Sequence, residues 1–236
     1  CIRDSFLLDC FHNSLAREVD MDITGTSLND TDEYALKCFN MMKNIYTKEY
    51  SEILDIFFSI QITELKSIKS GVNLNIIPEP FSILSLPIPG DIKEPTLQEC
   101  LDLYCKSEEL SGENAITNEK TKEKEDVTKK IIFWDLPKVL IIDLKRWNEN
   151  GNRNNKLVKA GINDVDLSKY VIGYNKLDNV YDLYGICNHS GGSMGGHYTA
   201  YIKNANNKWL SLIHISEPTR PERIGYWGLW VEKKKG

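Results

Sequence analysis

The segment NHSGGSMGGHYTAY, residues 188–201, places one histidine beside a run of glycines. The residues before it (181–187) alternate in polarity and those after it (198–202) are β-branched and aromatic, so both flanks predict strands. The glycines leave little side chain along one side of the loop between them, where another backbone can approach closely. These glycines are Gly191, Gly192, Gly195 and Gly196. We therefore predict a strand–loop–strand unit with His197 at the first position of the second strand.

A histidine at the start of a strand is suited to act as a general base, because a rigid element fixes the direction of its ring. The narrow space beside the glycines would suit an extended peptide with small residues. The alternative is a packed histidine in an ordinary hairpin, which is the commoner role of a single histidine. The residue types alone leave both interpretations open.

The same segment closely resembles the histidine box of the ubiquitin-specific proteases (ubiquitin carboxyl-terminal hydrolases), which are papain-like cysteine proteases. Further segments resemble motifs of that family, and they occur in the same order. They are FLLDCFH (6–12), FSILSLPIP (81–89), LQECLDLY (97–104), EELSG (108–112) and LPKVLIIDLKRW (136–147). The resemblance covers roughly residues 6–209, and several independent motifs in one order are hard to obtain by chance.

The resemblance implies that His197 is the general base of a deubiquitinase. It also implies contacts to the Gly-Gly tail of ubiquitin from His189, Ser190, Gly195, Gly196 and Tyr198. Tyr198 fits plain strand packing equally well. Asp143 and Arg146 flank a palm strand and are interpreted as structural. The implied partners are ubiquitin and ubiquitinated proteins.

The implied fold is the α+β hand of this family, with thumb helices in residues 6–60. Antiparallel fingers would follow in residues 61–130, and an antiparallel β palm in residues 131–209. The thumb is expected to be incomplete, because the family's cysteine-bearing helix has no counterpart in this sequence. Its remaining helices should then expose apolar surface.

A cysteine protease also needs a thiolate and a residue that orients the histidine. The sequence contains no match to the family's cysteine box (GLxNxGNTCYxNSxLQ), and Leu210–Ile213 stands where the family has Asp or Asn. No cysteine stands at a glycine-rich helix start that would lower its pKa. The six are Cys1, Cys10, Cys38, Cys100, Cys105 and Cys187. We expect this chain to be inactive as a protease.

The two ends share an unusual property. Residues 1–5 can be encoded by TGT ATA AGA GAC AGx, and the reverse complement of that string encodes Leu210–Ile213 in another frame. The string resembles the inverted end of a transposase adapter used in sequencing libraries, so residues 1–5 and about 210–236 are interpreted as translated adapter. Finding the same ends in transcripts sequenced without that transposase would exclude the idea. Residues 225–235 match no helix or strand pattern.

Local patterns predict the remaining elements. Residues 18–30 are acidic and polar, which indicates a loop, and Thr31 is a plausible N-cap for the helix that follows. Residues 51–58 predict a further helix, and residues 60–76 predict short strands with a turn at Ser70-Gly71. The charged stretch 118–130 predicts a solvated hairpin tip or flexible loop.

Many members of the family carry a zinc site of two Cys-x-x-Cys pairs in the fingers. The corresponding positions here are near Ile68, Gly71, Asn118 and Thr121, and none is a cysteine. We therefore expect no structural zinc and no cofactor, with the fingers held by strand pairing. Stoichiometric zinc in purified protein would contradict this.

Composition agrees with a globular protein of one or two cores, with 41% hydrophobic residues in 236. The net charge of −5 argues mildly against a nucleic-acid partner, and no apolar run predicts a membrane span. Sparse, irregularly spaced cysteines favour a reducing compartment, so we expect a cytoplasmic or nuclear location.

Two other functions remain open at this point. One is a ubiquitin-binding pseudoprotease that has lost the cysteine altogether. The other is an unrelated phosphate-binding protein, which is disfavoured because no Lys-Ser/Thr follows the glycines and no helix is predicted to begin there.

Overall fold

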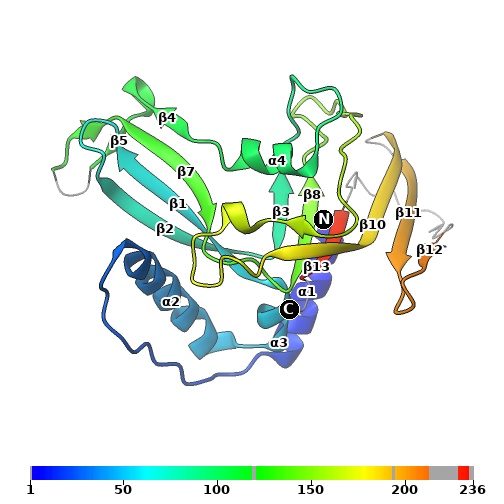
Figure 1. Cartoon of the computed structure of the whole chain (residues 1–236), viewed down its shortest axis with the longest axis horizontal. Helices are drawn as coiled ribbons and strands as arrows, with labels where there is room; N and C mark the ends of the chain where they lie inside the picture. Colours follow the sequence, from blue (N-terminus) through cyan, green and yellow to red (C-terminus); the bar gives the residue numbers. More distant parts are fainter. Residues whose placement is uncertain (1, 119–120, 193–194, 213–227, 234–236) are drawn as a thin grey trace.

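The structure, a computed structural model, describes residues 2–118, 121–192, 195–212 and 228–233. Three groups of elements meet near the centre of the molecule (Figure 1). We call the group of α1, α2 and α3 the thumb, the long sheet of β1, β2, β4 and β7 the fingers, and the sheet around β8 and β10 the palm. None of the described helices is long and apolar enough to cross a membrane.

The thumb contains α1 (Ile2–Leu15), α2 (Asp30–Glu49) and α3 (Glu52–Phe57). The prediction of Thr31 as the N-cap of α2 was wrong, because Asn29 holds that position. The Asn29 side chain accepts a hydrogen bond from the Asp32 N–H at 3.0 Å, and the Asp32 carboxylate accepts one from the Asn29 N–H at 3.1 Å. This reciprocal capping box satisfies two amide groups that a helix start leaves without partners.

The first helix leaves an apolar stripe on the surface. Leu7, Phe11 and Leu15 follow one another at four-residue spacing and are all exposed, so they share one face of α1. Leu8 points the other way and is buried. This exposed stripe agrees with the expectation that the thumb helices expose apolar surface.

The fingers form a four-stranded antiparallel sheet in the order β2-β1-β7-β4. Its strands are β1 (Ser59–Ser67), β2 (Asn73–Phe81), β4 (Glu108–Leu110) and β7 (Val127–Phe133). Gly71 lies in the predicted turn with a φ of +70°, a value that suits glycine. The fingers end in a short turn (η1, Gly112–Asn114) and a small hairpin of β5 (Ile116–Thr117) and β6 (Lys124–Glu125). The charged stretch 118–130 supplies β6 to this tip, but its residues 127–130 lie in β7, so the prediction of a tip or loop was wrong for them.

The palm sheet has the order β12-β11-β10-β13-β8-β3, with β9 paired to β10. Its strands are β3 (Ile83–Leu86), β8 (Val139–Leu144), β9 (Val165–Asp166), β10 (Val180–Gly192), β11 (Gly195–Lys203), β12 (Trp209–Leu212) and β13 (Gly228–Lys233). All pairs are antiparallel except β3 with β8, which are parallel. The strand β3 therefore joins the palm, although it falls inside residues 61–130, which were assigned to the fingers.

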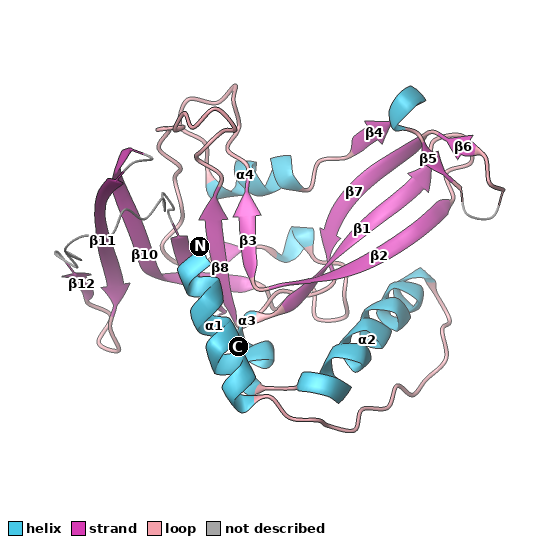
Figure 2. Ribbon diagram, turned by 180° about the vertical axis from the view of Figure 1, so that it is seen from behind, coloured by secondary structure: helices cyan, strands magenta, loops and turns pink. Residues whose placement is uncertain are grey.

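The main core lies where α4 (Leu97–Tyr104) covers the palm sheet (Figure 2). Its side chains come from α4, β3, β8 and the first half of β10, and all are nearly inaccessible. Among them are Leu84, Leu86, Leu97, Leu101, Leu140, Ile142, Tyr181 and Leu183. The Tyr181 hydroxyl donates a hydrogen bond to the Pro137 carbonyl at 2.6 Å, so the one polar atom of that ring is satisfied inside the core. A 3-10 turn (η2, Ser168–Tyr170) closes the core near β9.

The tail contains a strand that sequence analysis missed. Residues 228–233 form β13, which pairs with β10 on one side and β8 on the other. Leu229 and Val231 alternate into the core and are buried. The statement that residues 225–235 match no strand pattern was wrong. So short an alternation of apolar residues does not by itself identify a strand, and here β8 and β10, which are distant in sequence, stabilise it from both sides. That the tail is adapter sequence stays a prediction.

Candidate active site in the histidine hairpin

The glycine-rich segment is a paired hairpin and not a wide loop. Pairing between β10 and β11 continues to Gly191↔Gly196 and Gly192↔Gly195. We call residues 189–192 and 195–198 the histidine hairpin. The strand β11 begins at Gly195, so His197 is the third residue of its strand. The prediction that His197 holds the first position was therefore wrong. Gly191 and Gly195 have φ values of +138° and +158°, which glycine reaches without a Cβ clash.

The register places the two histidines on opposite faces of the palm sheet. His197 pairs with Ser190 and is exposed, whereas His189 pairs with Tyr198 and is 2% exposed. Side chains of paired residues share a face and neighbours along a strand alternate, so Ser190 accompanies His197 and Tyr198 accompanies His189. The rings of His189 and Tyr198 lie 4.6 Å apart between centroids.

One of the four glycines is required by the protein's own histidine. A Cβ on Gly196 would lie 2.1 Å from Nε2 of His189 and 2.7 Å from the Ser190 carbonyl oxygen. Above Gly192 and Gly195, no atom lies within 4 Å of an added Cβ. The space predicted beside Gly195 is therefore open, while the space beside Gly196 is filled by the His189 ring.

Burial controls the protonation of His189. Removal from water lowers the pKa of His189, and the nearby positive charge of Arg153 lowers it further. Among the described residues, Nδ1 of His189 is buried and has no hydrogen-bond partner. Because this nitrogen is buried, a ligand on the open face of the hairpin cannot reach it in this conformation.

Arg153 was not among the predicted site residues. It lies in the loop after β8, and its guanidinium donates to the carbonyl oxygens of His189 at 2.7 Å and Gly191 at 3.2 Å. A single arginine in a polar loop carries no periodic signal, so the contact is visible only in the folded chain.

The described cysteines do not resemble an activated nucleophile. Burial raises the pKa of Cys38 to about 12 and those of Cys100 and Cys105 to about 11. Cys187 pairs with Ala200 and so lies on the sheet face opposite to His197. Cys10 is exposed on α1. A raised pKa disfavours the thiolate, which is the nucleophilic form.

The fingers contain no metal cluster in their described part. Within the residues that the structure describes, no group of three or more His, Cys, Asp or Glu side chains could hold an ion. Ile68 follows β1, and Asn118 donates to Glu125 at 2.8 Å across the tip hairpin. The absence of a structural zinc stays a prediction.

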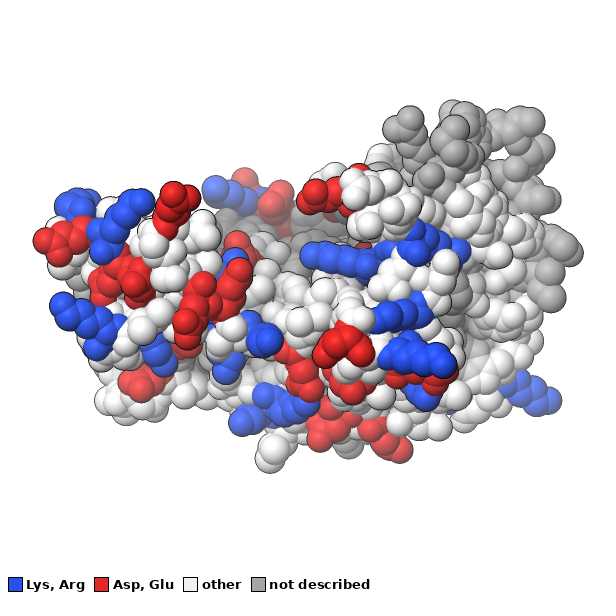
Figure 3. Space-filling model, turned by 90° about the horizontal axis from the view of Figure 1, so that it is seen from above, with Lys and Arg blue, Asp and Glu red and all other residues white. Residues whose placement is uncertain are grey.

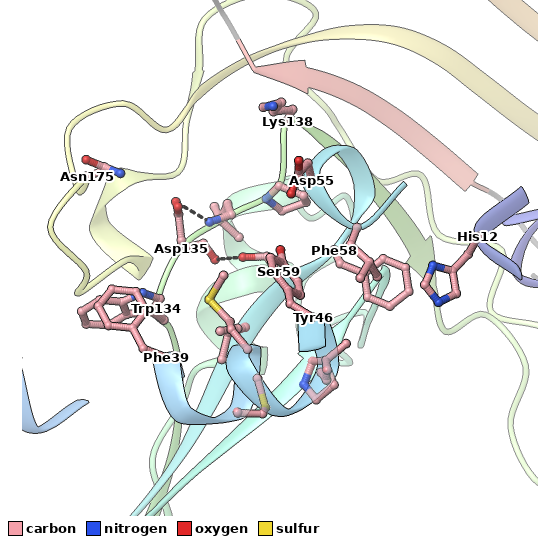
Figure 4. A pocket seen from close by; sticks show the side chains of 18 of the residues that line it. His12, Phe39, Tyr46, Asp55, Phe58, Ser59, Trp134, Asp135, Lys138 and Asn175 are labelled. Carbon is pink, nitrogen blue, oxygen red and sulfur yellow. Dashed lines mark hydrogen bonds between the residues drawn. The ribbon is translucent and has the colours of Figure 1, made fainter. Parts of the chain in front are cut away.

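A cavity lies away from the histidine hairpin. Its volume is about 740 Å³, and α1, α2, α3 and the turn before β8 supply its walls. Figure 4 shows His12 and Phe58 at one end and Phe39 and Trp134 at the other. The His12 Nδ1 lies 2.7 Å from the Ser51 hydroxyl oxygen, a contact that joins α1 to the start of α3. Neither His189 nor His197 lines this cavity.

Comparison with known proteins agrees with the motifs. The family model described as ubiquitin carboxyl-terminal hydrolase matches residues 5–216. Ubiquitin carboxyl-terminal hydrolase 2 of Bos taurus is 33% identical over 203 residues, covering 84% of this chain and 33% of that protein. The Gallus gallus protein of the same name is 33% identical over 211 residues, covering 87% of this chain and 58% of that protein. The chain thus spans between a third and three fifths of these relatives.

A solved structure shows the same fold. A chain of the yeast SAGA DUBm matches 78% of this chain with a TM-score of 0.60 and 24% identity, and the match covers 42% of that chain. The α+β hand expected from the motifs is therefore confirmed for the described elements.

Proposed function

The chain belongs to the ubiquitin carboxyl-terminal hydrolase family, and from that premise we propose that it is the histidine-bearing part of a cysteine-type deubiquitinase. His197 is the general base of this proposal. The observation that carries it is the position of His197, exposed on a strand that the palm sheet fixes, with Ser190 beside it on the same face. Such a ring is accessible to a substrate and held in direction.

In the proposed reaction a cysteine thiolate attacks the carbonyl of the terminal glycine of ubiquitin and forms a thioester. The proton that His197 took from the thiol passes to the leaving lysine amine, and water then hydrolyses the thioester. The chain's own contribution is the base and the substrate contacts. The sequence has no counterpart of the cysteine box, so this chain should bind ubiquitin without cleaving it.

The tail of ubiquitin would run along the open side of the hairpin. The free space above Gly192 and Gly195 admits a chain of small residues and excludes bulky ones. Of the five residues expected to contact this tail, Ser190 and Gly195 lie on the open face with His197, and we assign the contacts to them. His189, Gly196 and Tyr198 belong to the opposite face, where the His189 ring fills the space, so they would support the hairpin from behind. Seen from above, the surface is hollowed between the fingers and the palm, and charges of both signs are interspersed over it (Figure 3). Such a hollow could receive a globular partner.

Titration of ¹⁵N-labelled ubiquitin with this chain tests the binding. We expect shifts at the C-terminal glycines of ubiquitin and no hydrolysis of a fluorogenic ubiquitin amide. The His197→Ala variant should reduce the shifts, while His12→Ala, on the thumb, should leave them unchanged. Ubiquitin amides that do not move at millimolar protein would refute the proposal.

The second candidate function is a pseudoprotease that only binds ubiquitin. It is favoured by the position of Cys187, which shares the strand of the hairpin but lies on the sheet face opposite to His197. A long read of the native transcript separates the two functions. A cysteine box with Asp or Asn shortly after Trp209 means an active protease, and native sequence without that cysteine means a binding protein.

A further inference from the structure

Among the residues that the structure describes, strand pairing holds the far end of β10 along one edge. The described part of β13 ends at Gly228, opposite Cys187, so its pairing stops before the histidine hairpin. On the other side, β11 pairs with β10 but is itself covered only by the four-residue strand β12. The tip glycines contribute no side chains. Within the described residues, the hairpin part of β10 is therefore paired with β11 along one edge and with no strand along the other.

Arg153 makes the missing contacts. Its two terminal nitrogens donate to the carbonyl oxygens of His189 and Gly191, two residues apart on β10. Carbonyls at this spacing point to the same edge of a strand, where a neighbouring strand would otherwise donate its amides. Hydrogen bonds from a charged guanidinium are stronger than those between neutral groups. The guanidinium therefore continues the ladder beyond the end of β13.

The loop that carries Arg153 is itself fixed by two further cations. Arg146 is buried and donates to the carbonyls of Asn154 and Lys156 at 3.1 and 2.7 Å. The Lys156 ammonium donates to three carbonyls of the segment after β3, those of Pro89, Gly90 and Ile92, at 2.6–2.8 Å. The loop after β8 is thus tied to the palm before Arg153 reaches the hairpin, so Arg153 acts from a rigid base.

We propose that Arg153 is a positioning residue of the candidate active site, which fixes the histidine hairpin by clamping the carbonyls of His189 and Gly191. The inference rests on the proposed function for its link to ubiquitin, but the clamp itself concerns only this chain. Arg153 does not touch the reacting atoms. It acts through β10, by holding Ser190 and its partner His197 in one place for the incoming tail.

The charge of Arg153 gives the clamp its own spectroscopic signature. The His189 ring packs against the Tyr198 ring. Burial is the main cause of the lowered pKa of His189, and the positive charge of Arg153 is the second cause. Removing that charge should raise the pKa of His189, whereas a purely spatial support would leave it unchanged. Imidazole NMR signals of His189 report this directly.

The test compares three variants of the full chain by amide hydrogen exchange, His189 titration and ubiquitin binding. In Arg153→Gln, hairpin amides should exchange on the order of tenfold faster and ubiquitin should bind about tenfold more weakly, as expected for lost charged hydrogen bonds. Arg153→Lys keeps the charge, so it should retain the lowered pKa of His189 but recover only part of the exchange protection.

Arg17→Gln is the matched control. Arg17 also donates two hydrogen bonds, but to the exposed carboxylate of Glu52 in the thumb. Its loss should leave the hairpin unaffected. Wild-type exchange rates and an unchanged His189 pKa in Arg153→Gln would overturn the clamp. Should wild-type chain fail to bind ubiquitin, the proposed function is lost, while exchange and titration still decide the role of Arg153.

Discussion

The two halves of β10 differ in almost every respect, although they belong to one strand. The first half, residues 180–187, pairs with β13 along one edge and with β9 and then β11 along the other, and it sends Tyr181 and Leu183 into the main core. The second half, residues 188–192, extends past the end of β13 and finishes in exposed glycines. The first half stabilises the sheet, whereas the second carries His189 and pairs with the part of β11 that carries His197. A continuous strand lets a stable core fix the direction of side chains outside it.

Truncation in the first half should have the largest effect. Leu183 is 2% exposed, so Leu183→Ala leaves a cavity and should cost about 2–5 kcal/mol of unfolding free energy. Leu177→Ala is the control, because Leu177 is 84% exposed. Urea unfolding followed by circular dichroism measures both. Equal midpoints for the two variants would show that the first half does not carry the stability assigned to it.

A substitution in β11, opposite the second half of β10, should have a smaller and more local effect. In Gly196→Ala the new methyl group must displace the His189 ring, at a cost of about 1–3 kcal/mol. Gly192→Ala meets no atom within 4 Å and should be nearly neutral. Unfolding midpoints and His189 NMR shifts distinguish the two. If both variants behave alike, His189 does not occupy the space above Gly196.

Mild acidification should have the smallest effect, and in the second half it should act through His189. The pKa of His189 is lowered, chiefly by burial, so the folded chain favours the neutral ring. Its contribution to stability is present above the ordinary pKa of about 6.5 and is lost as the pH falls through the lowered value. Stability should therefore decline as the pH falls below about 6.5, and His189→Asn should flatten that decline. An unchanged slope would contradict the assignment.

Local patterns predicted the elements whose ends are set by nearby residues. The segment LQECLDLY, identified as a family motif, forms α4 over its whole length, since Thr96 and Glu99 form a capping box within its first turn. The N-cap of α2 was misplaced by two residues, because Asn29 and Thr31 are both good caps and only the partner Asp32 decides between them. The strand β13 was missed, because its burial depends on β8 and β10.

The site was predictable in its residues but not in its geometry. The motif around His197 identified the histidine, but the opposite faces of His189 and His197 follow from the β10–β11 register. That register places Gly196 against the His189 ring, where a side chain would clash. It also presents the carbonyl oxygens of His189 and Gly191 to Arg153. Contacts between residues so far apart in sequence have no local signature.

The pairing within the fingers also has a consequence for folding speed. The central pair joins β1 to β7, with Gln61 opposite Phe133, whereas β1 and β2 are neighbours along the chain. Closing so long a loop costs conformational entropy before the β1–β7 hydrogen bonds can stabilise the chain. The β1–β2 hairpin should therefore form early, and β7 should pair with β1 late. Until β7 arrives, β1 offers an open edge carrying Ile62 and Leu65 to any other chain. Refolding at high protein concentration should accordingly lose material to aggregation through this edge.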